Sequence, residues 1–247
     1  MKGELIIGKN PVKEVLRSGR DINKIWINER AKRSMQPILR LAKQEGVQVQ
    51  AVPRQKLDQL AEGENHQGIV ASVAAHRYAE MDELFRRAEE KGERPFFVVL
   101  DEIEDPHNLG AILRTADASG VHGVIIPKRR SSGLTSIVAK ASAGAVEYVP
   151  VVRVTNLART IDELKKRGLW FVGADAAGRE DYREADFDIP VGLVVGNEGK
   201  GISRLVKEKC DFLVQLPMAG KVLSLNASVA AALLMYEVYR KRYSQGV

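Results

Sequence analysis

From residue 94 onwards the sequence alternates between strand-like and helix-like segments, and this alternation restricts the fold more than any other feature. Residues 95–100 form a continuous apolar run, which is typical of parallel strands buried on both faces. Further strands are predicted at residues 121–126, 147–152, 169–174, 191–195 and 212–216. Such alternation predicts an α/β fold with a parallel sheet, whose ligands lie beyond the carboxyl ends of its strands.

A smaller module precedes this sheet. Residues 1–75 also alternate between predicted helices and strands, which indicates a compact three-layer α/β unit. Residues 76–93 are charged and carry apolar side chains at helical spacing, so they form a short amphipathic helix or a linker. We therefore expect domains at 1–75 and 94–247. His66 lies in a polar turn with no metal-ligand spacing around it, which favours a surface or turn residue over a ligand.

The positive charge is concentrated in the first module. The whole chain has a net charge of +6, and residues 1–75 hold 13 Lys and Arg against 8 Asp and Glu, a net charge of +5. A basic module ahead of a nearly neutral one is typical of a protein that binds a polyanion. A basic surface that only maintains solubility explains the same numbers, and the charge alone leaves both open.

Composition excludes several classes of protein. The single cysteine, Cys210, rules out an intramolecular disulfide and a multi-cysteine metal site. The first ten residues lack the apolar segment of a signal peptide, and no apolar run approaches the length of a membrane span. We expect a soluble cytoplasmic protein without a bound metal.

The stretch from 216 to 235 contains an unusual entry into a helix. A predicted strand stops at Pro217, a loop follows, and Ser224 and Asn226 then precede a helix that is almost entirely apolar. Both side chains are of types that cap helices, so polar groups and free backbone amides converge on one junction. This predicts either a polar ligand site or a capped core helix. A helix that is apolar on all sides is buried by its own domain or by a partner.

Two other loops follow predicted strands. One is 105–110, where we expect Asn108 to cap a helix that carries Arg114, and the other is 196–201. Neither loop matches a dinucleotide fingerprint or a phosphate-binding loop, and no nucleophile elbow occurs. A helical pair with Asp117, which has a small energetic value, is the structural alternative for Arg114.

Taken together, these three loops resemble a known family. Asn108, Gly110 and Arg114, the run 194–201 and the run 216–230 are similar, in this order, to the three motifs of the SpoU-type 2'-O-ribose RNA methyltransferases of the SPOUT superfamily. The runs 105–110 and 153–160 resemble most closely the branch that methylates a guanosine ribose in the peptidyl-transferase loop of 23S rRNA.

The resemblance implies a SPOUT fold with a deep trefoil knot, a small N-terminal substrate-binding domain similar to a ribosomal protein, a homodimer, and S-adenosylmethionine as cofactor. It implies a catalytic set of Asn108, Arg114, Glu198, Ser224 and Asn226. The implied cofactor-binding residues are Gly196, Asn197, Gly201, Leu216, Met218, Leu225 and Asn226. No metal is implied. The alternatives are the same reaction on tRNA and a noncatalytic RNA-binding ribosome-assembly factor.

The family resemblance casts Arg114 as a general base, which conflicts with the chemistry of its guanidinium. The pKa of arginine lies above about 12, so deprotonation is very costly. We expect Arg114 to hold a phosphate or ribose oxygen and to stabilise a developing alkoxide, while the proton leaves through water. Glu198 would anchor its loop or orient Arg114, and Ser224 and Asn226 would fix the ribose and the loop.

Overall fold

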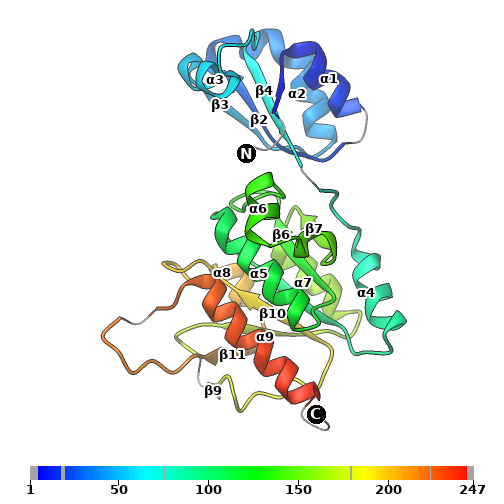
Figure 1. Cartoon of the computed structure of the whole chain (residues 1–247), viewed down its shortest axis with the longest axis vertical. Helices are drawn as coiled ribbons and strands as arrows, with labels where there is room; N and C mark the ends of the chain where they lie inside the picture. Colours follow the sequence, from blue (N-terminus) through cyan, green and yellow to red (C-terminus); the bar gives the residue numbers. More distant parts are fainter. Residues whose placement is uncertain (1–4, 18–19, 75, 179, 223, 244–247) are drawn as a thin grey trace. The chain divides into compact units, whose positions relative to one another are not determined.

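Figure 1 shows the computed structural model of the chain, which describes residues 5–17, 20–74, 76–178, 180–222 and 224–243. The chain divides into two compact units. The first contains residues 1–77 and 133–139, and the second contains residues 78–132 and 140–247. The domain limits expected from the sequence, at 75 and 94, remain a proposal.

The first unit is built on a four-stranded sheet with strand order β1-β4-β2-β3. Its strands are β1 (Leu5–Ile7), β2 (Ile22–Asn28), β3 (Val49–Val52) and β4 (Ile69–Val73). Its helices are α1 (Lys9–Arg17), the 3-10 helix η1 (Glu29–Met35), α2 (Gln36–Gln44) and α3 (Arg54–Ala61). Only β2 and β3 are parallel, while β4 is antiparallel to β1 and to β2.

Alternate side chains of β4 enter two different cores. Ile69 and Ala71 pack with apolar side chains of α1 and α2, whereas Val70 packs with Leu57 and Ala61 of α3. This separation follows from the strand period of two, which directs successive side chains to opposite faces. Helices therefore cover both faces of the sheet, as Figure 1 also shows, and the predicted three-layer unit is confirmed.

From the sequence, His66 was expected to be a surface residue or a turn residue. His66 lies in the turn, but it is buried and not at the surface. His66 is 5% exposed, and its Nδ1 accepts a hydrogen bond of 2.9 Å from the Gly68 amide. Since Nδ1 is an acceptor, the neutral ring carries its proton on Nε2, which lies 2.9 Å from Oδ1 of Asp58. A buried polar side chain needs such partners, and here two local ones supply them. His66 therefore has a structural role within its turn.

The second unit contains a seven-stranded sheet with strand order β7-β6-β5-β10-β8-β11-β9. The strands are β5 (Phe96–Leu100), β6 (Gly123–Pro127), β7 (Val151–Val154), β8 (Trp170–Ala174), β9 (Glu180–Asp181), β10 (Val191–Val195) and β11 (Phe212–Gln215). Every neighbouring pair is parallel, which confirms the predicted parallel sheet. The knot implied by the family resemblance remains a prediction.

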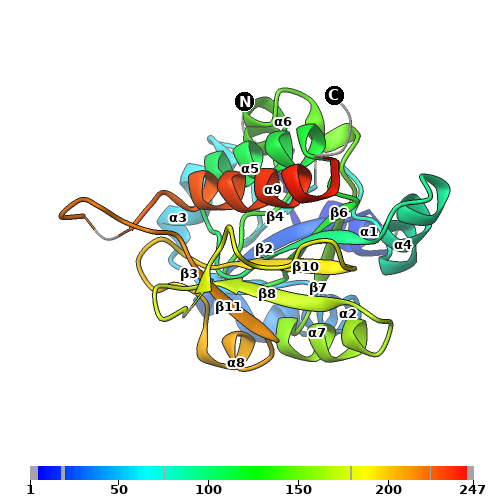
Figure 2. The same ribbon diagram turned by 90° about the horizontal axis from the view of Figure 1, so that it is seen from below.

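Helices cover both faces of this sheet. They include α4 (Met81–Glu90), α5 (Pro106–Ala118), α7 (Leu157–Lys165), α8 (Arg204–Lys207) and α9 (Ala227–Tyr243). The chain between β6 and β7 contains α6 (Ser136–Ala141), most of which belongs to the first unit, and a short 3-10 helix η2 (Ala145–Glu147) of the second unit. Figure 2 shows α5 and α9 on one face and α7 and α8 on the other. The amphipathic segment 76–93 contains α4, whose Leu84 is fully buried against Phe97 and Ile161 of this unit.

The predicted strand at 147–152 begins later than expected. Residues 145–147 form a 3-10 turn, in which the amides of Glu147 and Val149 donate to the carbonyls of Gly144 and Ala145. Pro150 has no amide hydrogen to donate to a neighbouring strand. β7 therefore starts at Val151, and the preceding apolar residues belong to the turn.

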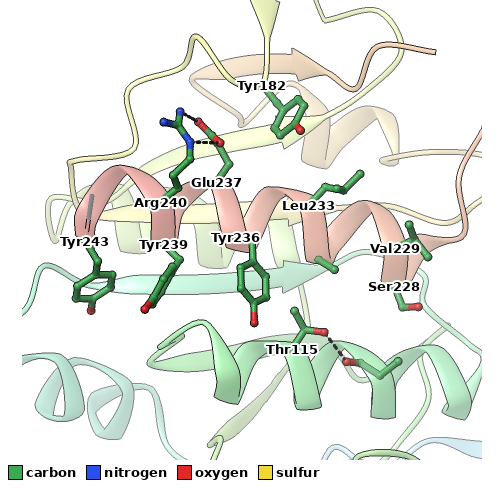
Figure 3. Close-up of a pocket in the computed structure, with 12 residues that line it drawn as sticks. Thr115, Tyr182, Ser228, Val229, Leu233, Tyr236, Glu237, Tyr239, Arg240 and Tyr243 are labelled. Atoms are coloured by element: carbon green, nitrogen blue, oxygen red, sulfur yellow. Dashed lines mark hydrogen bonds and ion pairs between the residues drawn. The ribbon is translucent and has the colours of Figure 1, made fainter. Parts of the chain in front are cut away.

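The apolar helix at the C-terminus is only half covered. Ala231, Leu234 and Val238 are buried inside the second unit, where α9 packs against α5. Leu233 and Tyr236 are 41% and 50% exposed and line an open groove of about 820 Å³ (Figure 3). The unit thus buries one face of the helix and leaves the other face uncovered.

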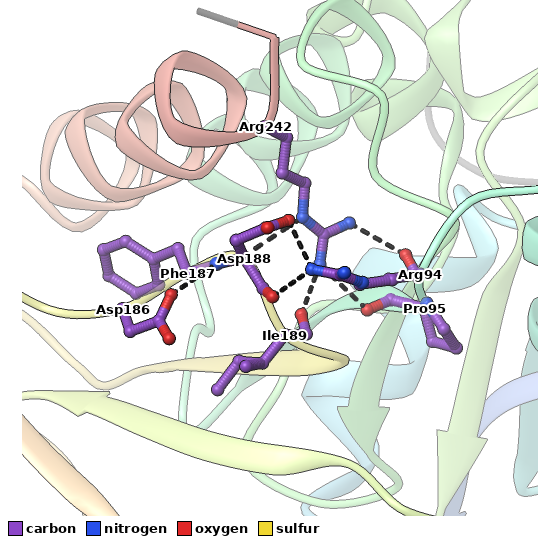
Figure 4. Close-up of polar contacts among 7 residues, drawn as sticks. All are labelled: Arg94, Pro95, Asp186, Phe187, Asp188, Ile189 and Arg242. Atoms are coloured by element: carbon purple, nitrogen blue, oxygen red, sulfur yellow. Dashed lines mark hydrogen bonds and ion pairs between the residues drawn. The ribbon is translucent and has the colours of Figure 1, made fainter.

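Arg242 fixes the last turn of α9. Its guanidinium donates to the main-chain oxygens of Arg94, Pro95, Phe187 and Ile189 at distances of 2.6–3.3 Å (Figure 4). The same group lies 5.2 Å from the centroid of the Phe96 ring. These contacts join the end of α9 to the start of β5 and to the segment before β10.

No helix within the described ranges has the length and apolar character needed to cross a membrane.

Candidate active site

Three loops meet at the carboxyl edge of the second sheet. They follow β5, β10 and β11, which are the strands that precede the three unusual loops of the sequence. β5 pairs directly with β10, and β8 lies between β10 and β11. Because all these strands run in parallel, their loops emerge on the same side, as expected for a ligand site in an open α/β sheet.

A cleft of about 620 Å³ is lined by the loops after β10 and β11, and its volume is within the range of about 300–1,000 Å³ typical of small-molecule sites. The residues that were predicted for the site and line the cleft are Gly196, Asn197, Glu198, Gly201, Leu216, Met218, Ser224 and Leu225. They come from two loops that are separate in sequence. Asn108, Arg114 and Asn226, which were also predicted, are not among the lining residues.

Gly196 allows the chain to close tightly at the floor of this cleft. A Cβ atom at Gly196 would lie 2.2 Å from the carbonyl carbon of Gly201, so no larger residue fits without moving the backbone. The amide of Asn197 donates to the Gly201 carbonyl, and the Gly201 amide donates back to Asn197, at 3.1 and 2.8 Å. The loop is therefore a narrow, closed turn that presents backbone groups to the cleft.

The side chain of Asn197 holds this turn from inside. Its Oδ1 accepts hydrogen bonds from the amides of Gly199 and Lys200, at 2.9 and 3.4 Å. Its Nδ2 donates to the Glu102 carbonyl, 3.3 Å away in the loop after β5. Asn197 thus connects the β10 loop to the β5 loop.

Glu198 joins all three loops through one carboxylate oxygen. Its Oε1 accepts from Nδ2 of Asn108 at 2.9 Å, from Nδ2 of Asn226 at 2.6 Å, and from the amide of Ala227 at 3.0 Å. Nδ2 of Asn226 also lies 2.9 Å from Oδ1 of Asn108. Three residues predicted from separate motifs are therefore brought into direct contact.

Asn226 caps α9, as its position in the sequence suggested. Its Oδ1 accepts from the amides of Ser228 and Val229, at 3.0 and 3.4 Å. Ser224, the other cap type in this stretch, makes no hydrogen bond with any residue in the described part of the chain, and its exposed side chain lines the cleft.

The prediction that Asn108 caps its helix is wrong. Asp105 is the cap, because Pro106 fits the first helical position and the Asp105 carboxylate accepts from the His107 amide at 2.9 Å. The helix therefore starts earlier, and Asn108 lies in its first turn. This leaves the Asn108 amide free for Glu198 and Asn226.

The structure does not bring Arg114 into the Glu198 cluster. Arg114 is exposed on α5, and its guanidinium makes no hydrogen bond or ion pair with Asp117 or with any other described residue. The helical pair with Asp117 is thus not formed. An arginine without an internal partner can direct all its donors to a ligand.

Asp175 and Lys207 are charged lining residues that the sequence did not predict. They form an ion pair of 2.6 Å between Oδ2 and Nζ. Asp175 directly follows the predicted strand 169–174. Because ligands bind beyond the carboxyl ends of parallel strands, this position could have identified Asp175 as a candidate site residue. Nothing in the sequence around Lys207 pointed to the cleft.

Among the described residues, no group of three or more His, Cys, Asp or Glu could hold a metal ion.

The cleft suits a ligand with both apolar and polar parts. Leu216, Met218 and Leu225 offer apolar surface, and the closed turn 196–201 offers backbone groups beside the Asp175–Lys207 pair. Such mixed linings, with a few fixed polar groups, are typical of cofactor sites. Glu198 itself lines this cleft, so the polar junction that it forms with Asn108 and Asn226 would lie next to a ligand in the cleft.

Comparison with known families gives two matches that together cover most of the chain. A model of the SpoU rRNA Methylase family matches residues 95–236, and a model described as RNA 2'-O ribose methyltransferase substrate binding matches residues 5–79. A Bacillus subtilis (strain 168) protein assigned to the TrmH family of tRNA/rRNA methyltransferases is 62% identical over 98% of each chain.

Solved structures give the same result. The SpoU methyltransferase AviRb from Streptomyces viridochromogenes, in complex with AdoMet, is 28% identical with a TM-score of 0.63, and the match covers 97% of this chain and 90% of AviRb. The TrmH/SpoU tRNA modifying enzyme of A. aeolicus is 30% identical with a TM-score of 0.57, and its match covers 66% of this chain and 86% of that enzyme.

Proposed function

Because this chain belongs to the SpoU rRNA methylase family of RNA methyltransferases, we propose that it methylates a ribose 2'-hydroxyl of RNA. The proposed substrate is a guanosine in the peptidyl-transferase loop of 23S rRNA, and the proposed location is the cytoplasm. The observation that carries the proposal is the contact of Asn108, Glu198 and Asn226 beside the cleft. The substrate-binding family model supports the ribose 2'-oxygen as acceptor.

Two observations favour rRNA over tRNA. The tRNA modifying enzyme of A. aeolicus matches only 66% of this chain, so a third of the chain has no counterpart there. The first module is also the basic one, with a net charge of +5 over residues 1–75, which suits a separate domain that binds a large RNA. The runs 105–110 and 153–160 support the guanosine branch through their resemblance to it.

The family uses S-adenosylmethionine, and the cleft fits this cofactor. We assign the cofactor to Gly196, Asn197, Gly201, Leu216, Met218 and Leu225, all of which line the cleft. When bound, the cofactor supplies a methyl group on a sulfonium centre. Asn226 was also predicted to bind it, but its side chain is held by Asn108 and Glu198, so we assign Asn226 to the junction.

Glu198 anchors the junction in this proposal. Both anchoring and the orientation of Arg114 were open from the sequence, and the contacts of its Oε1 with Asn108, Asn226 and Ala227 support the first. Rigid positioning of a hydroxyl next to the methyl donor supplies a large part of the rate of such a reaction. Ser224, exposed at the cleft, is proposed to bind the ribose.

Arg114 is proposed to act as an electrostatic clamp. Its free guanidinium holds a phosphate or the ribose oxygen, and its positive charge stabilises the alkoxide that develops as the hydroxyl loses its proton to water. The absence of an internal partner within the described residues supports this role, because no donor of Arg114 is already occupied.

The exposed face of α9 supports a homodimer. Val229, Leu233, Tyr236 and Tyr239 are each at least 39% exposed on this face (Figure 3). Contiguous apolar surfaces of this kind mark interfaces with other proteins. The same helix is capped by Asn226, so a partner on this face would lie next to the proposed active site.

The proposal is tested by mapping 2'-O-methylated nucleotides by mass spectrometry in rRNA and tRNA from cells with and without this gene. We expect one guanosine of 23S rRNA to lose its methyl group in the deletion strain. Loss of a tRNA methyl group instead would move the substrate to tRNA. An unchanged methylation pattern, together with normal RNA binding, would favour a noncatalytic assembly factor.

A further inference from the structure

Two residues at the carboxyl edge of the second sheet hold their backbones in the left-handed region although neither is glycine. Glu102, in the loop after β5, has a φ of 60°, and Arg130, in the loop after β6, has a φ of 54°. β5 and β6 are adjacent parallel strands, so both loops leave the sheet on the same side. A residue with a Cβ atom keeps this conformation only where its surroundings enforce it.

An ion pair connects these two strained residues. Nη1 of Arg130 lies 2.6 Å from Oε1 of Glu102, whose side chain is 17% exposed. The amide of Ser132 donates to the Ile103 carbonyl at 2.8 Å, which joins the same two loops a second time. Partly exposed ion pairs add little to global stability. The Arg130–Glu102 pair therefore acts locally, on the conformation of Glu102.

The main chain of Glu102 continues this connection into the cleft. Its carbonyl accepts the hydrogen bond from Nδ2 of Asn197, and Asn197 in turn accepts from the amides of Gly199 and Lys200. The direction of the Glu102 carbonyl depends on the backbone angles of Glu102. If Glu102 left the left-handed region, Asn197 would lose this partner, and the turn 196–201 would lose its link to the β5 loop.

We propose that Arg130 and Glu102 are positioning residues for the turn 196–201, since their ion pair keeps Glu102 in the conformation that orients Asn197. This inference rests on the proposed binding of S-adenosylmethionine in the cleft. It assigns Arg130 a role toward the cofactor, although among the described residues its side chain forms no hydrogen bond or ion pair with a residue that lines the cleft.

The test uses glycine at position 102 to separate conformation from charge. Glycine adopts a positive φ without steric cost, so Glu102→Gly removes the ion pair and also the need for it. Calorimetry with S-adenosylmethionine should show about tenfold weaker binding for Arg130→Ala and for Glu102→Ala. Glu102→Gly and the double variant Glu102→Gly/Arg130→Ala should both stay within about threefold of the wild type, because glycine makes the arginine unnecessary.

A second measurement reports on the turn without the cofactor. Amide hydrogen exchange in residues 197–201 should become faster in Arg130→Ala and should stay at the wild-type rate in Glu102→Gly. Arg129→Ala is the matched control, because this neighbouring cation makes no ion pair with any described residue and should change neither measurement.

Three outcomes would overturn the inference, and a fourth would contradict the proposed function. Equal losses of cofactor affinity from Arg130→Ala in the wild-type and Glu102→Gly backgrounds would overturn the inference, and so would weaker RNA binding with unchanged cofactor affinity. Wild-type cofactor affinity and exchange rates in Arg130→Ala would overturn it as well. Failure of the wild-type protein to bind S-adenosylmethionine would instead contradict the proposed function, so the two failures are distinguishable.

Discussion

Glu198 and Asn226 are joined by a hydrogen bond of 2.6 Å that connects the turn after β10 to the cap of α9. Oε1 of Glu198 is also the acceptor for Asn108 and for the Ala227 amide. Hydrogen bonds to charged groups contribute about 1.5–3 kcal/mol each when buried, and less when they are exposed. This one carboxylate therefore has a large influence on the geometry of the junction.

Replacing Glu198 should affect catalysis more than stability. Glu198→Ala leaves three donors without their acceptor, and we expect the single-turnover methyl-transfer rate to fall by about tenfold to hundredfold, which corresponds to about 1.4–2.7 kcal/mol. Glu198→Gln keeps an oxygen but loses the charge, so its rate should lie in between. Glu208→Ala is the control, because Glu208 pairs with Arg204 on the surface of α8. A rate within about twofold of the wild type in Glu198→Ala would remove Glu198 from the site.

Substitution of Arg114 separates a clamp from a general base. Arg114→Ala should cost about 2.7–4 kcal/mol in the transition state, as for the removal of an oxyanion donor. Arg114→Lys keeps the charge but loses the planar fork, so it should recover part of the rate. The measurement is single-turnover methyl transfer against pH, with cofactor and RNA saturating.

The pH profile of Arg114→Lys decides between the two roles. A lysine acting as base would become active as its amine deprotonates, near its reference pKa of about 10.4. A rise in rate at alkaline pH that appears only in this variant would contradict the clamp. Full activity of Arg114→Ala would exclude Arg114 from the reaction altogether.

A charge on the exposed face of α9 should dissociate the proposed dimer. Leu233→Asp introduces a carboxylate into the apolar groove, where it would be desolvated without a partner in the interface. Analytical ultracentrifugation should then show a monomer, while the wild type sediments as a dimer. Leu205→Asp is the control, because Leu205 is 59% exposed on α8, on the opposite face of the sheet. A wild-type protein that stays monomeric at all concentrations would contradict the dimer.

The first module should set the salt dependence of RNA binding. Neutralising cations that contact phosphates reduces the slope of log affinity against log salt by about 0.7–0.9 per contact. We expect the variant Lys9→Gln/Lys13→Gln, which changes two cations of α1, to lower this slope and to leave cofactor affinity unchanged. Lys165 and Lys209 of the second unit form ion pairs with Asp211 and Asp162, so their glutamine variants are the control. An unchanged slope in the α1 variant would place the RNA on another surface.

Acid should destabilise the second unit through His122. Burial lowers the pKa of His122 from 6.5 to about 4, although the hydrogen bond with Glu93 opposes this shift. The Phe96 amide donates to Nδ1 of His122 at 3.0 Å, so the ring must stay neutral to accept it. Protonation removes that acceptor and places a charge on a side chain with no exposed surface.

The sign of this effect follows from the direction of the shift. The folded protein holds His122 neutral more strongly than the unfolded chain, so the stabilisation is present above pH 6.5 and is lost as the pH falls towards 4. The loss amounts to about 3 kcal/mol at most. Urea unfolding at pH 7, 6 and 5 should show a smaller decrease for His122→Gln than for the wild type. His107→Gln, at an exposed residue, should keep the wild-type decrease.

The parallel sheet could be predicted because its signals are local. Continuous apolar runs at 95–100 and 191–195 became β5 and β10 with almost the same limits. The strand at 147–152 was predicted to begin too early, since apolar content alone does not show that the amides before Pro150 are used in a turn. Strand order was not predictable either, because the insertion of β10 between β5 and β8 depends on contacts between distant segments.

The members of the site were predicted through motifs, but their contacts were not. Nothing in the sequence indicates that Glu198 accepts from both Asn108 and Asn226, since 90 and 28 residues separate these pairs. The cap of α5 shows a related limit. Asp105 and Asn108 are both good caps, and only the position of Pro106 between them favours the first.

Arg242 contacts its four partners through their main-chain oxygens. Backbone carbonyls are the same in every amino acid, so this attachment does not depend on which side chains occupy positions 94, 95, 187 and 189. Mutational drift at those four positions can therefore leave the attachment intact as long as the local backbone path is kept. The guanidinium has no such tolerance, because lysine cannot supply its planar set of donors. A single missense change at position 242 would therefore detach the end of α9, whereas substitutions at the four partner positions that keep the backbone path would not.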